Sequence, residues 1–571
     1  MADEFAAGRR IVIDGHPLPH ACEPLLEELV VEDDLHLPDR FRLRFSDAEN
    51  TVLEQSGLKI GSRVTITVSA VGASTMSPLI TGEVTAVEAE YTPQGTHVMV
   101  RGYALSYRLQ TRRETKAWRN VKDSDIAREL AAAHGITVGQ VDDSKVVHTH
   151  LPQLNLTDWE FLQARAREIG FDLRVTDSKL QFRKPPAAHN PAVTLTMRDN
   201  LERFHPRLSS AAQASGVTVR SWDPSAKKAV MGTGRPATVS ASVPLTPSRL
   251  AESAHASGHL AADRALDTQT EAGDVAAALA ERIASSFLEA EGTARGDPQL
   301  RAGACVAVAR VASDFKGHCV LTSTRHVWDG IDGYKTHFVV SGRQERSLLG
   351  LATGAVSNGP GAAPRVYGMV VAIVTNVKDP ESLGRAKVKF PWLSDAYESD
   401  WVRVCQVGAG KQRGALFLPE VEDEVLVAFE HGDVRRPYVL GGLYNGVDKP
   451  NVGNALIDDT SGAVKRRGIV SNHGHKLVFF DDAAKSGVAL ISAGNLRVAL
   501  KDTGTTIHVS SGGTVLIEGK NVTVRAQEAL RLASDGTVAI EGKSISVKAS
   551  TEASVQGEAA VAVKGGVVRI N

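Results

Sequence analysis

Near the end of the chain, the segment Gly513-Thr-Val-Leu-Ile-Glu-Gly-Lys-Asn-Val-Thr-Val-Arg-Ala526 recurs 23 residues later as Gly536-Thr-Val-Ala-Ile-Glu-Gly-Lys-Ser-Ile-Ser-Val-Lys-Ala549. Each copy alternates apolar and polar residues with the period of a β-strand, is interrupted at Gly-Lys-Asn or Gly-Lys-Ser, and then alternates again. Short strands separated by glycine breaks at a fixed period are typical of a β-solenoid. The repeat therefore predicts a winding β-structure in this region.

The tail that contains the repeat, residues 481–571, has no aromatic residue, proline, cysteine or methionine. Strands built from small aliphatic and polar residues imply an interior too narrow to hold an aromatic side chain. A single copy would leave its apolar face and its backbone edges uncovered, so it should not be stable alone. Three copies wound around one axis would bury the face and pair the edges. We therefore expect residues 468–571 to form one third of a rigid trimeric β-helix, or β-prism, needle.

Length and composition indicate a globular protein of several domains. A chain of 571 residues is too long for one hydrophobic core. The net charge of −1 gives no reason to expect a nucleic-acid-binding surface. The four cysteines are scattered, which argues against a disulfide scaffold or a zinc ribbon; they are Cys22, Cys305, Cys319 and Cys405. Neither a secretion signal nor an apolar stretch long enough to span a bilayer is visible.

The first 185 residues alternate strands with two helices. Asp123–Ala133 has helical spacing, and Thr157–Ile169 begins with a capping box of Thr157 and Glu160 and ends at Gly170. Period-two alternation predicts strands at Phe41–Phe45, Arg63–Val68 and Val98–Arg101. Residues 209–262 are rich in Ala, Ser, Gly and Pro and predict long loops. A helix over Val275–Glu289 and strands at Val306–Arg310 and His337–Val340 follow.

An all-β block spans residues 366–446 after a linker at 352–365. Five or so short strands with Gly, Pro and Asp turns suit a small closed barrel. The segment Pro419-Glu-Val-Glu-Asp-Glu-Val425, with Gly432-Asp433 and Arg436-Pro437, closely resembles the oligonucleotide/oligosaccharide-binding (OB) fold of phage baseplate spikes and VgrG-type spikes. Glu422 stands where that family usually has glycine, so this turn is expected to differ.

The N-terminal region is similar to the phage tail hub fused in front of such spikes. The resemblance rests on Leu58–Val64, Leu79–Val84, Arg101–Ser106, Leu156–Leu162 and the segment from His326 to Phe338. It implies a mainly β fold with some α: hub β-barrel domains with helical insertions, an OB barrel and a needle. The expected domains are 1–185 (first hub domain), 186–351 (second hub domain with a loop-rich insertion), 352–365 (linker), 366–446 (OB fold), 447–467 (connector) and 468–571 (needle).

The resemblance also implies a function. Such a chain forms the homotrimeric central spike of a contractile injection system, whose hub docks on baseplate proteins and the inner tube while the needle punctures a target membrane mechanically. A PAAR-like tip protein would bind the blunt end built by Val567, Val568, Arg569, Ile570 and Asn571. We expect assembly in the bacterial cytoplasm without a signal peptide, possible release within an extracellular particle, possible effector cargo, transient membrane contact and no nucleic-acid partner.

Three classes of injection system remain open. A spike that ends without an effector domain fits an extracellular phage-tail-like particle slightly better than a type VI secretion spike, and a prophage tail comes third. Only Gly446–Arg467 lies between barrel and needle, too little for a lysozyme domain. We therefore expect no catalytic residues. The alternative, a spike that carries a cell-wall-degrading enzyme, is less favoured. A carbohydrate-binding tail fibre would need exposed aromatic residues on the needle, and none follows Phe480.

Several motifs suggest chemistry but have simpler explanations. Gly536–Ser544 resembles a phosphate-binding loop, yet it has five residues between its glycines and no following helix. His255 and His259 lack the glutamate of a metalloprotease. The pairs His148/His150 and His473/His475 suggest structural roles, and Trp392 with Trp401 suggests barrel packing rather than base stacking. No cofactor and no metal site are therefore predicted.

Overall fold

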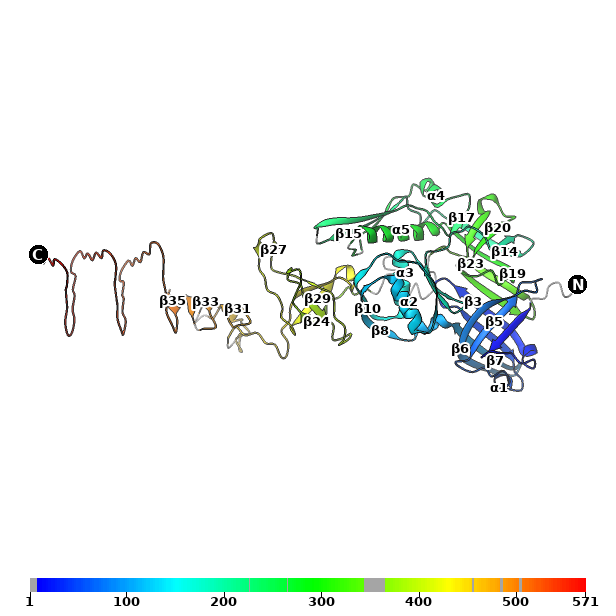
Figure 1. Cartoon of the computed structure of the whole chain (residues 1–571), viewed down its shortest axis with the longest axis horizontal. Coiled ribbons are helices and arrows are strands. Elements are labelled where there is room, and N and C mark those ends of the chain that lie inside the picture. The colour runs from blue at the N-terminus through cyan, green and yellow to red at the C-terminus, as the bar shows by residue number, and fades with distance from the viewer. Residues whose placement is uncertain are drawn as a thin grey trace. The chain divides into compact units, whose positions relative to one another are not determined.

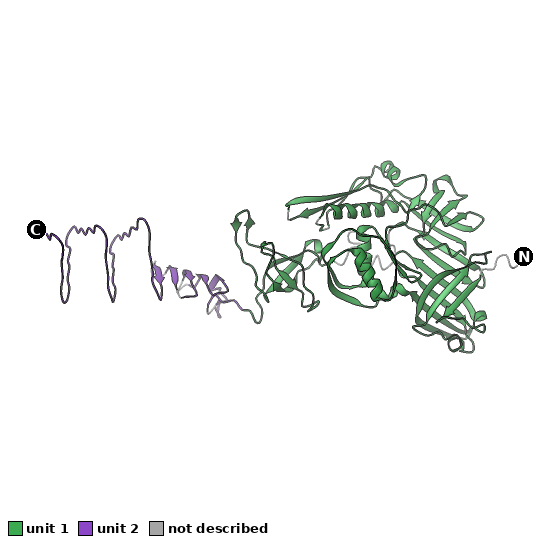
Figure 2. Cartoon of the chain, in the orientation of Figure 1, with its two compact units in different colours: residues 1–448 green, residues 449–571 purple. Residues whose placement is uncertain are grey.

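The structure is a computed structural model that describes residues 8–224, 226–263, 265–266, 268–343, 365–453, 456–482, 486–494, 496–502 and 506–570. The chain divides into two compact units, residues 1–448 and 449–571 (Figure 2). Most regular elements are strands, which confirms the mainly β class with some α. Within the described ranges, no helix is long and apolar enough to cross a membrane.

An eleven-stranded sheet is the largest element of the first unit (Figure 1). Its order is β14-β19-β23-β22-β3-β4-β7-β6-β5-β1-β2. The strands are β1 (Arg9–Ile13), β2 (His16–Pro17), β3 (Leu26–Asp34), β4 (Arg40–Ser46), β5 (Arg63–Ser69), β6 (Met76–Thr92), β7 (Gly95–Ala104), β14 (Leu201–Leu208), β19 (Leu288–Arg295), β22 (Ser323–Asp329) and β23 (Gly333–Val340). Short helices α1 (Val52–Ser56), η2 (Glu23–Leu25) and η3 (Leu105–Gln110) join them.

The pairing of β3 with β22 joins the two predicted hub regions in one sheet. Glu28 lies opposite Asp329, and Asp34 lies opposite Ser323. Alternation along these strands buries Leu29 and Val31 in the core with Phe41, while the residues between them face the other side. The sequence-distant halves of the hub are therefore held by backbone hydrogen bonds.

A smaller layer of helices and strands follows β7. It comprises β8 (Arg113–Val121), α2 (Asp123–Ala133), β9 (Thr137–Val141), β10 (His148–Thr157), α3 (Asp158–Ile169), β11 (Asp172–Thr176) and β12 (Lys179–Arg183). Helix α2 has the predicted bounds. Helix α3 begins with both hydrogen bonds of the Thr157/Glu160 capping box and ends at Gly170, whose φ of 74° lies in the left-handed region. Both helix predictions are confirmed.

The region between β12 and β23 corrects two expectations. Its elements are β13 (Val193–Thr196), β15 (Val217–Asp223), β16 (Lys228–Gly234), β17 (Ala241–Ser242), α4 (Pro247–Ser253), β18 (His259–Ala261), α5 (Gln269–Ser285), β20 (Cys305–Ala309), η4 (Ser313–Phe315) and β21 (Gly317–Val320). Only about half of residues 209–262 are loops, because β15, β16 and β18 form a sheet that packs on α5. The helix expected at Val275–Glu289 starts six residues earlier, after a Thr268/Glu271 capping box, and Leu288 already belongs to β19.

A closed five-stranded barrel completes the first unit. It consists of β24 (Val370–Asn376), β25 (Lys387–Lys389), β26 (Arg403–Val404), β29 (Glu424–Phe429) and β30 (Pro437–Gly442), with the short helix η6 (Glu430–Gly432) between the last two. The order is β25-β24-β29-β30-β26, and a bridge from Ala386 to Val402 closes the ring. This confirms the predicted OB-type barrel.

The turn at Glu422 keeps its shape without glycine. Glu422 has a φ of 77°, and its backbone N–H donates to the Val374 carbonyl at 2.8 Å. Left-handed backbone is costly for a residue with a Cβ, which explains why glycine is usual here. Glu422 thus holds a left-handed conformation that favours glycine, at a cost in local strain.

The second unit contains one antiparallel meander. Its strands are β31 (Arg466–Val470), β32 (Lys476–Phe480), β33 (Gly487–Ile491), β34 (Arg497–Lys501) and β35 (Thr506–Ser510), paired in chain order. Residues 511–570 contain no assigned helix or strand, and Figure 1 draws them as an open trace. The predicted linker, except Arg365, lies outside the described residues.

Candidate functional site: the apolar strip of the C-terminal unit

One face of the β31–β35 meander is apolar from its first strand to its last. Leu477 pairs with Leu490, which pairs with Val498, so all three side chains point the same way. A neighbouring row on that face runs from Phe479 through Val488 to Leu500. The whole set, which we name the apolar strip, is Ile469, Leu477, Phe479, Val488, Leu490, Val498, Leu500, Ile507 and Val509.

The apolar strip is open to solvent in a single chain. Leu490 is 57% exposed and Ile507 is 74% exposed. On the opposite face, the small central residues Val478, Ala489 and Ala499 are buried. A soluble protein rarely exposes so continuous an apolar surface unless another surface covers it. The strip is therefore the strongest candidate for an interface in the described part of the chain.

Both copies of the sequence repeat are uncovered as well. Leu516 and Val524 in the first copy, and Ile540 and Val547 in the second, are exposed and belong to no strand. Within the described residues, no strand pairs with either copy, and the first glycine of each copy donates only to a nearby serine side chain. Backbone groups of a strand need a partner strand, so both copies lack the pairing that their alternation predicts.

The predicted tip residues lie at the end of this open trace. Val567, Val568 and Ile570 are exposed, as is Arg569. Asn571 lies outside the described residues. The structure brings the four described residues into no pocket or cluster with the apolar strip, and their contact with a tip protein stays a prediction.

Within the first unit, a chain of charged side chains joins the hub to the barrel. Arg165 donates from Nε to Asp123 Oδ1 at 2.7 Å and from Nη1 to Glu168 Oε2 at 2.5 Å. Arg435 of the barrel donates to Glu168 Oε1 at 3.1 Å and to Asp433 Oδ2 at 2.7 Å. We name these five residues the hub–barrel joint. Burial alone would raise the pKa of Asp123, but Arg165 and His148 outweigh it and hold that pKa well below its usual range.

Sequence reasoning missed the hub–barrel joint. Glu168 and Arg435 are 267 positions apart and belong to different predicted domains. Each looks like an ordinary surface charge in its own segment, and only an inspection of charged residues at the predicted helix end could have suggested a partner. The histidine pair at the same junction has the structural role that was predicted: His148 contacts Asp123 at 3.1 Å, and His150 contacts the Glu398 carbonyl at 3.2 Å.

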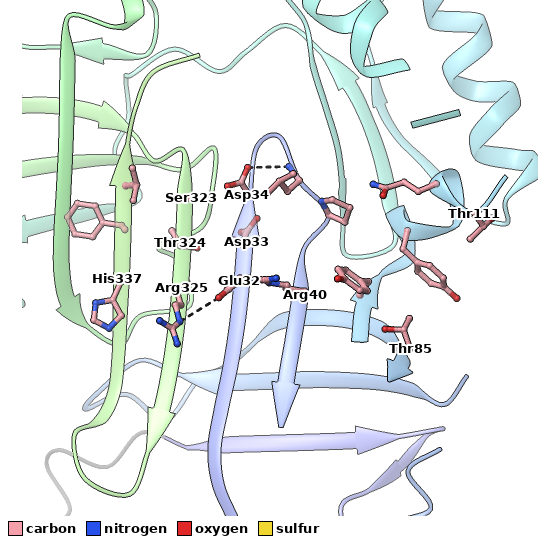
Figure 3. Close-up of a pocket in the computed structure, with 17 residues that line it drawn as sticks. Glu32, Asp33, Asp34, Arg40, Thr85, Thr111, Ser323, Thr324, Arg325 and His337 are labelled. Carbon is pink, nitrogen blue, oxygen red and sulfur yellow. Dashed lines mark hydrogen bonds and ion pairs between the residues drawn. The ribbon is translucent and has the colours of Figure 1, made fainter. Parts of the chain in front are cut away.

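A groove of about 890 Å³ lies on the hub sheet near the β3–β4 turn (Figure 3). Glu32 contacts Arg40 and also lies 3.6 Å from Arg325, while Asp34 Oδ1 accepts from the backbone of His36 at 2.7 Å. Burial raises the pKa of Asp34 despite those backbone hydrogen bonds. The charged groups of the groove thus satisfy one another, and the geometry assigns no ligand to it.

The other motifs considered in the sequence form no site. His255 and His259 are exposed, and His475 Nδ1 accepts from the backbone N–H of Ala493 at 3.2 Å. Gly536–Ser544 precedes no helix in the described ranges. Trp401 lies under Lys387, whose Nζ is 5.2 Å from the ring centroid. Among the residues that the structure describes, no group of three or more metal-binding side chains comes together.

Two family models match the chain. One, described as the Alg8 N-terminal domain, matches residues 45–329, which covers most of the hub. The other, described as the type VI secretion system/phage-baseplate injector OB domain, matches residues 370–444. The second match coincides with the closed barrel.

Two curated relatives agree with the match of the barrel to the injector OB domain. The chain is 34% identical over 142 residues to the type VI secretion system spike protein VgrG3 of Vibrio cholerae, covering 24% of this chain and 14% of the relative. It is 33% identical over 140 residues to the actin cross-linking toxin VgrG1 of another Vibrio cholerae strain, covering 23% of this chain and 13% of the toxin. The aligned part therefore spans about one seventh of each relative's length.

The fold of most of the chain resembles a chain of a solved PdpA–VgrG complex. The Francisella PdpA–VgrG complex in its lidded form aligns with a TM-score of 0.54 at 8% identity, covering 89% of this chain and 81% of that one. At this identity the match concerns the fold alone. Together with the barrel match, it supports a hub followed by a spike.

Proposed function

We propose that the chain, a VgrG-like hub–spike protein, is the homotrimeric central spike of a contractile injection system. The observation that carries the proposal is the exposed apolar strip, together with the two exposed repeats that follow it. Each fully buried Leu, Ile, Val or Phe contributes roughly 1.5–3 kcal/mol, so covering the nine residues of the apolar strip would strongly favour association.

A trimer would cover the exposed apolar strip and would also give the two exposed repeats partner strands. Apolar strips from three chains can meet on a common axis, and the repeat segments can then pair with those of the neighbouring chains. Continuous interchain pairing leaves few unpaired backbone groups and gives a stiff rod. A stiff, narrow rod is suited to concentrate a driving force on a membrane.

In this proposal the hub holds the spike in the particle. The hub, residues 1 to about 350, binds baseplate proteins and the inner tube, and the residues at 567–571 receive a PAAR-like tip protein. Effector cargo, assembly in the bacterial cytoplasm and membrane puncture belong to the same proposal. The matched relatives include a type VI spike, and the family model of the barrel covers both type VI and phage-baseplate injectors. The preference for an extracellular phage-tail-like particle therefore stays a prediction from the sequence.

We infer a mechanical rather than a catalytic role for the chain. The support is that the groups in the hub groove and the hub–barrel joint pair with one another in structural networks. One relative is named as an actin cross-linking toxin, but the match spans only 13% of that protein. The inference therefore concerns this sequence and not its larger relatives.

Light scattering of the purified full chain tests the proposal. We expect a mass three times the 60.8 kDa of one chain. The double variant Leu490→Asp/Leu500→Asp places charge on the apolar strip and should shift the mass toward one chain. The control Lys501→Asp changes a residue on the opposite face of the meander and should leave the trimer intact. A wild-type monomer would overturn the proposal.

A further inference from the structure

A β-ribbon projects from the barrel between β26 and β29. It spans residues 405–418 and contains the paired strands β27 (Ala409–Gly410) and β28 (Arg413–Gly414) (Figure 1). We name it the ribbon. Its base is fixed twice: Gln406 Oε1 accepts from the Phe417 N–H at 2.8 Å, and the Cys405 N–H donates to the Val439 carbonyl at 2.8 Å. The ribbon therefore has a preset direction at the point where it leaves the barrel.

The ribbon carries apolar side chains that its own chain leaves uncovered. Val407 is 84% exposed and Leu416 is 71% exposed, and Phe417 beside them is also exposed. Turns and loops at a surface usually carry polar residues, and a two-stranded ribbon is marginally stable alone. Apolar residues on such a ribbon indicate a surface that covers them.

The barrel offers a matching surface on its outer wall. Val371 of β24 lies opposite Leu426 of β29, and Leu440 is the extra residue where β30 is irregular. The Trp392 indole donates from Nε1 to the Val371 carbonyl at 3.1 Å, and its ring is 56% exposed. We name Met369, Val371, Trp392, Leu426 and Leu440 the barrel patch.

The ribbon and the barrel patch occupy different sectors of one barrel. The strand order is β25-β24-β29-β30-β26, with the patch centred on β24 and β29 and the ribbon leaving from β26. A contact between one copy's ribbon and another copy's patch would join two different surfaces. Contacts of that head-to-tail kind close into rings when the rotation allows it.

Charge also favours this pairing. Lys411 and Arg413 lie at the tip of the ribbon, and neither forms an ion pair within the described part of the chain. Asp395, three residues after Trp392, is exposed beside the barrel patch. A basic tip and an acidic border are complementary, which favours one orientation of the contact.

We propose that the ribbon of each chain lies across the barrel patch of a second copy of the same chain, so that three ribbons clasp three barrels in a ring. The inference rests on the proposed homotrimer and adds where the barrels hold one another. The occupant is a second copy because the apolar and charged counterparts of the ribbon are both present on the chain itself.

Disulfide cross-linking in the full chain tests this contact. In a Cys405→Ser background, Leu416→Cys is combined with Val371→Cys on β24, and the protein is oxidised and run on a denaturing gel. We expect most of the protein to run as a covalent trimer, because each ribbon links to the next barrel. Each single cysteine variant, and a control pair of Leu416→Cys with Ile331→Cys, an exposed position in the β22–β23 turn of the hub sheet, should stay uncoupled.

Other results would overturn the inference in distinguishable ways. Covalent dimers without trimers would indicate a self-complementary contact, and loss of thiols without a size change would place the ribbon on its own barrel. Uncoupled chains in a sample whose light-scattering mass is trimeric would contradict the ribbon contact and leave the spike proposal standing. A monomeric mass before oxidation would contradict both.

Discussion

His326 shows how one buried residue contributes to the response of the hub to pH. It is fully buried on β22, where Nδ1 contacts Tyr334 Oη at 2.9 Å and Nε2 contacts the Leu300 carbonyl at 2.9 Å. Burial lowers its pKa from 6.5 to about 4. The folded hub thus binds a proton on this ring less readily than the unfolded chain does.

The free energy of unfolding should therefore fall as the pH drops from 6.5 toward 4. The pKa of His326 is lower in the folded hub than in the unfolded chain. The stabilisation that this difference gives is therefore complete above the unfolded pKa and is lost on acidification, by about 3 kcal/mol. Denaturant titrations across this range should show the step in the wild type and a reduced step in His326→Gln. His20→Gln, at a fully exposed side chain, is the control. Equal pH profiles for all three proteins would contradict the assignment.

Residue-level patterns in the sequence predicted some features and missed others. The Thr157/Glu160 capping box predicted the start of α3 because its signal lies within four residues. The sequence carries an equivalent box at Thr268/Glu271, which marks the true start of α5, six residues before the predicted start at Val275. The β15–β16 hairpin was missed because its apolar residues are few and its strands are completed by packing on α5.

At the level of elements, the hub–barrel joint links α3 to the loop that precedes β30. The joint is charged, and removing Glu168 or Arg435 leaves the other with one ion-pair partner fewer: Arg435 keeps Asp433, and Glu168 keeps Arg165. Beside the joint, the hub residues Ala117 and Leu154 pack against the barrel core. The joint should thus increase the cooperativity with which the hub and the barrel unfold.

We expect Glu168→Ala and Arg435→Ala to show a coupling energy of about 1–3 kcal/mol in a double-mutant cycle on the free energy of unfolding. The matched control is the exposed pair Asp125 and Arg128 on α2, whose atoms lie 2.9 Å apart. That pair should couple by less than about 0.5 kcal/mol because solvent screens it. Additive effects of the two joint variants would show that the pair does not link hub and barrel.

For the whole molecule, the sequence predicted the barrel and the winding tail but not how the parts meet. The barrel is local, with turns and strands within 80 or so residues, so its signals are close together. The needle is the opposite case. Its period is visible in Gly513–Ala526 and Gly536–Ala549, yet a single chain leaves both segments exposed. In the proposed trimer, the strands that complete them come from the other two chains.

The most direct test of the central claim is amide hydrogen exchange on the full chain, read at the two repeats. If three chains wind into one needle, the amides of residues 513–526 and 536–549 are hydrogen-bonded between chains. We predict that they stay protected for hours, as in the core of a stable protein. Complete exchange within seconds at every protein concentration would mean that the repeats find no partner strand, and it would contradict the trimeric spike.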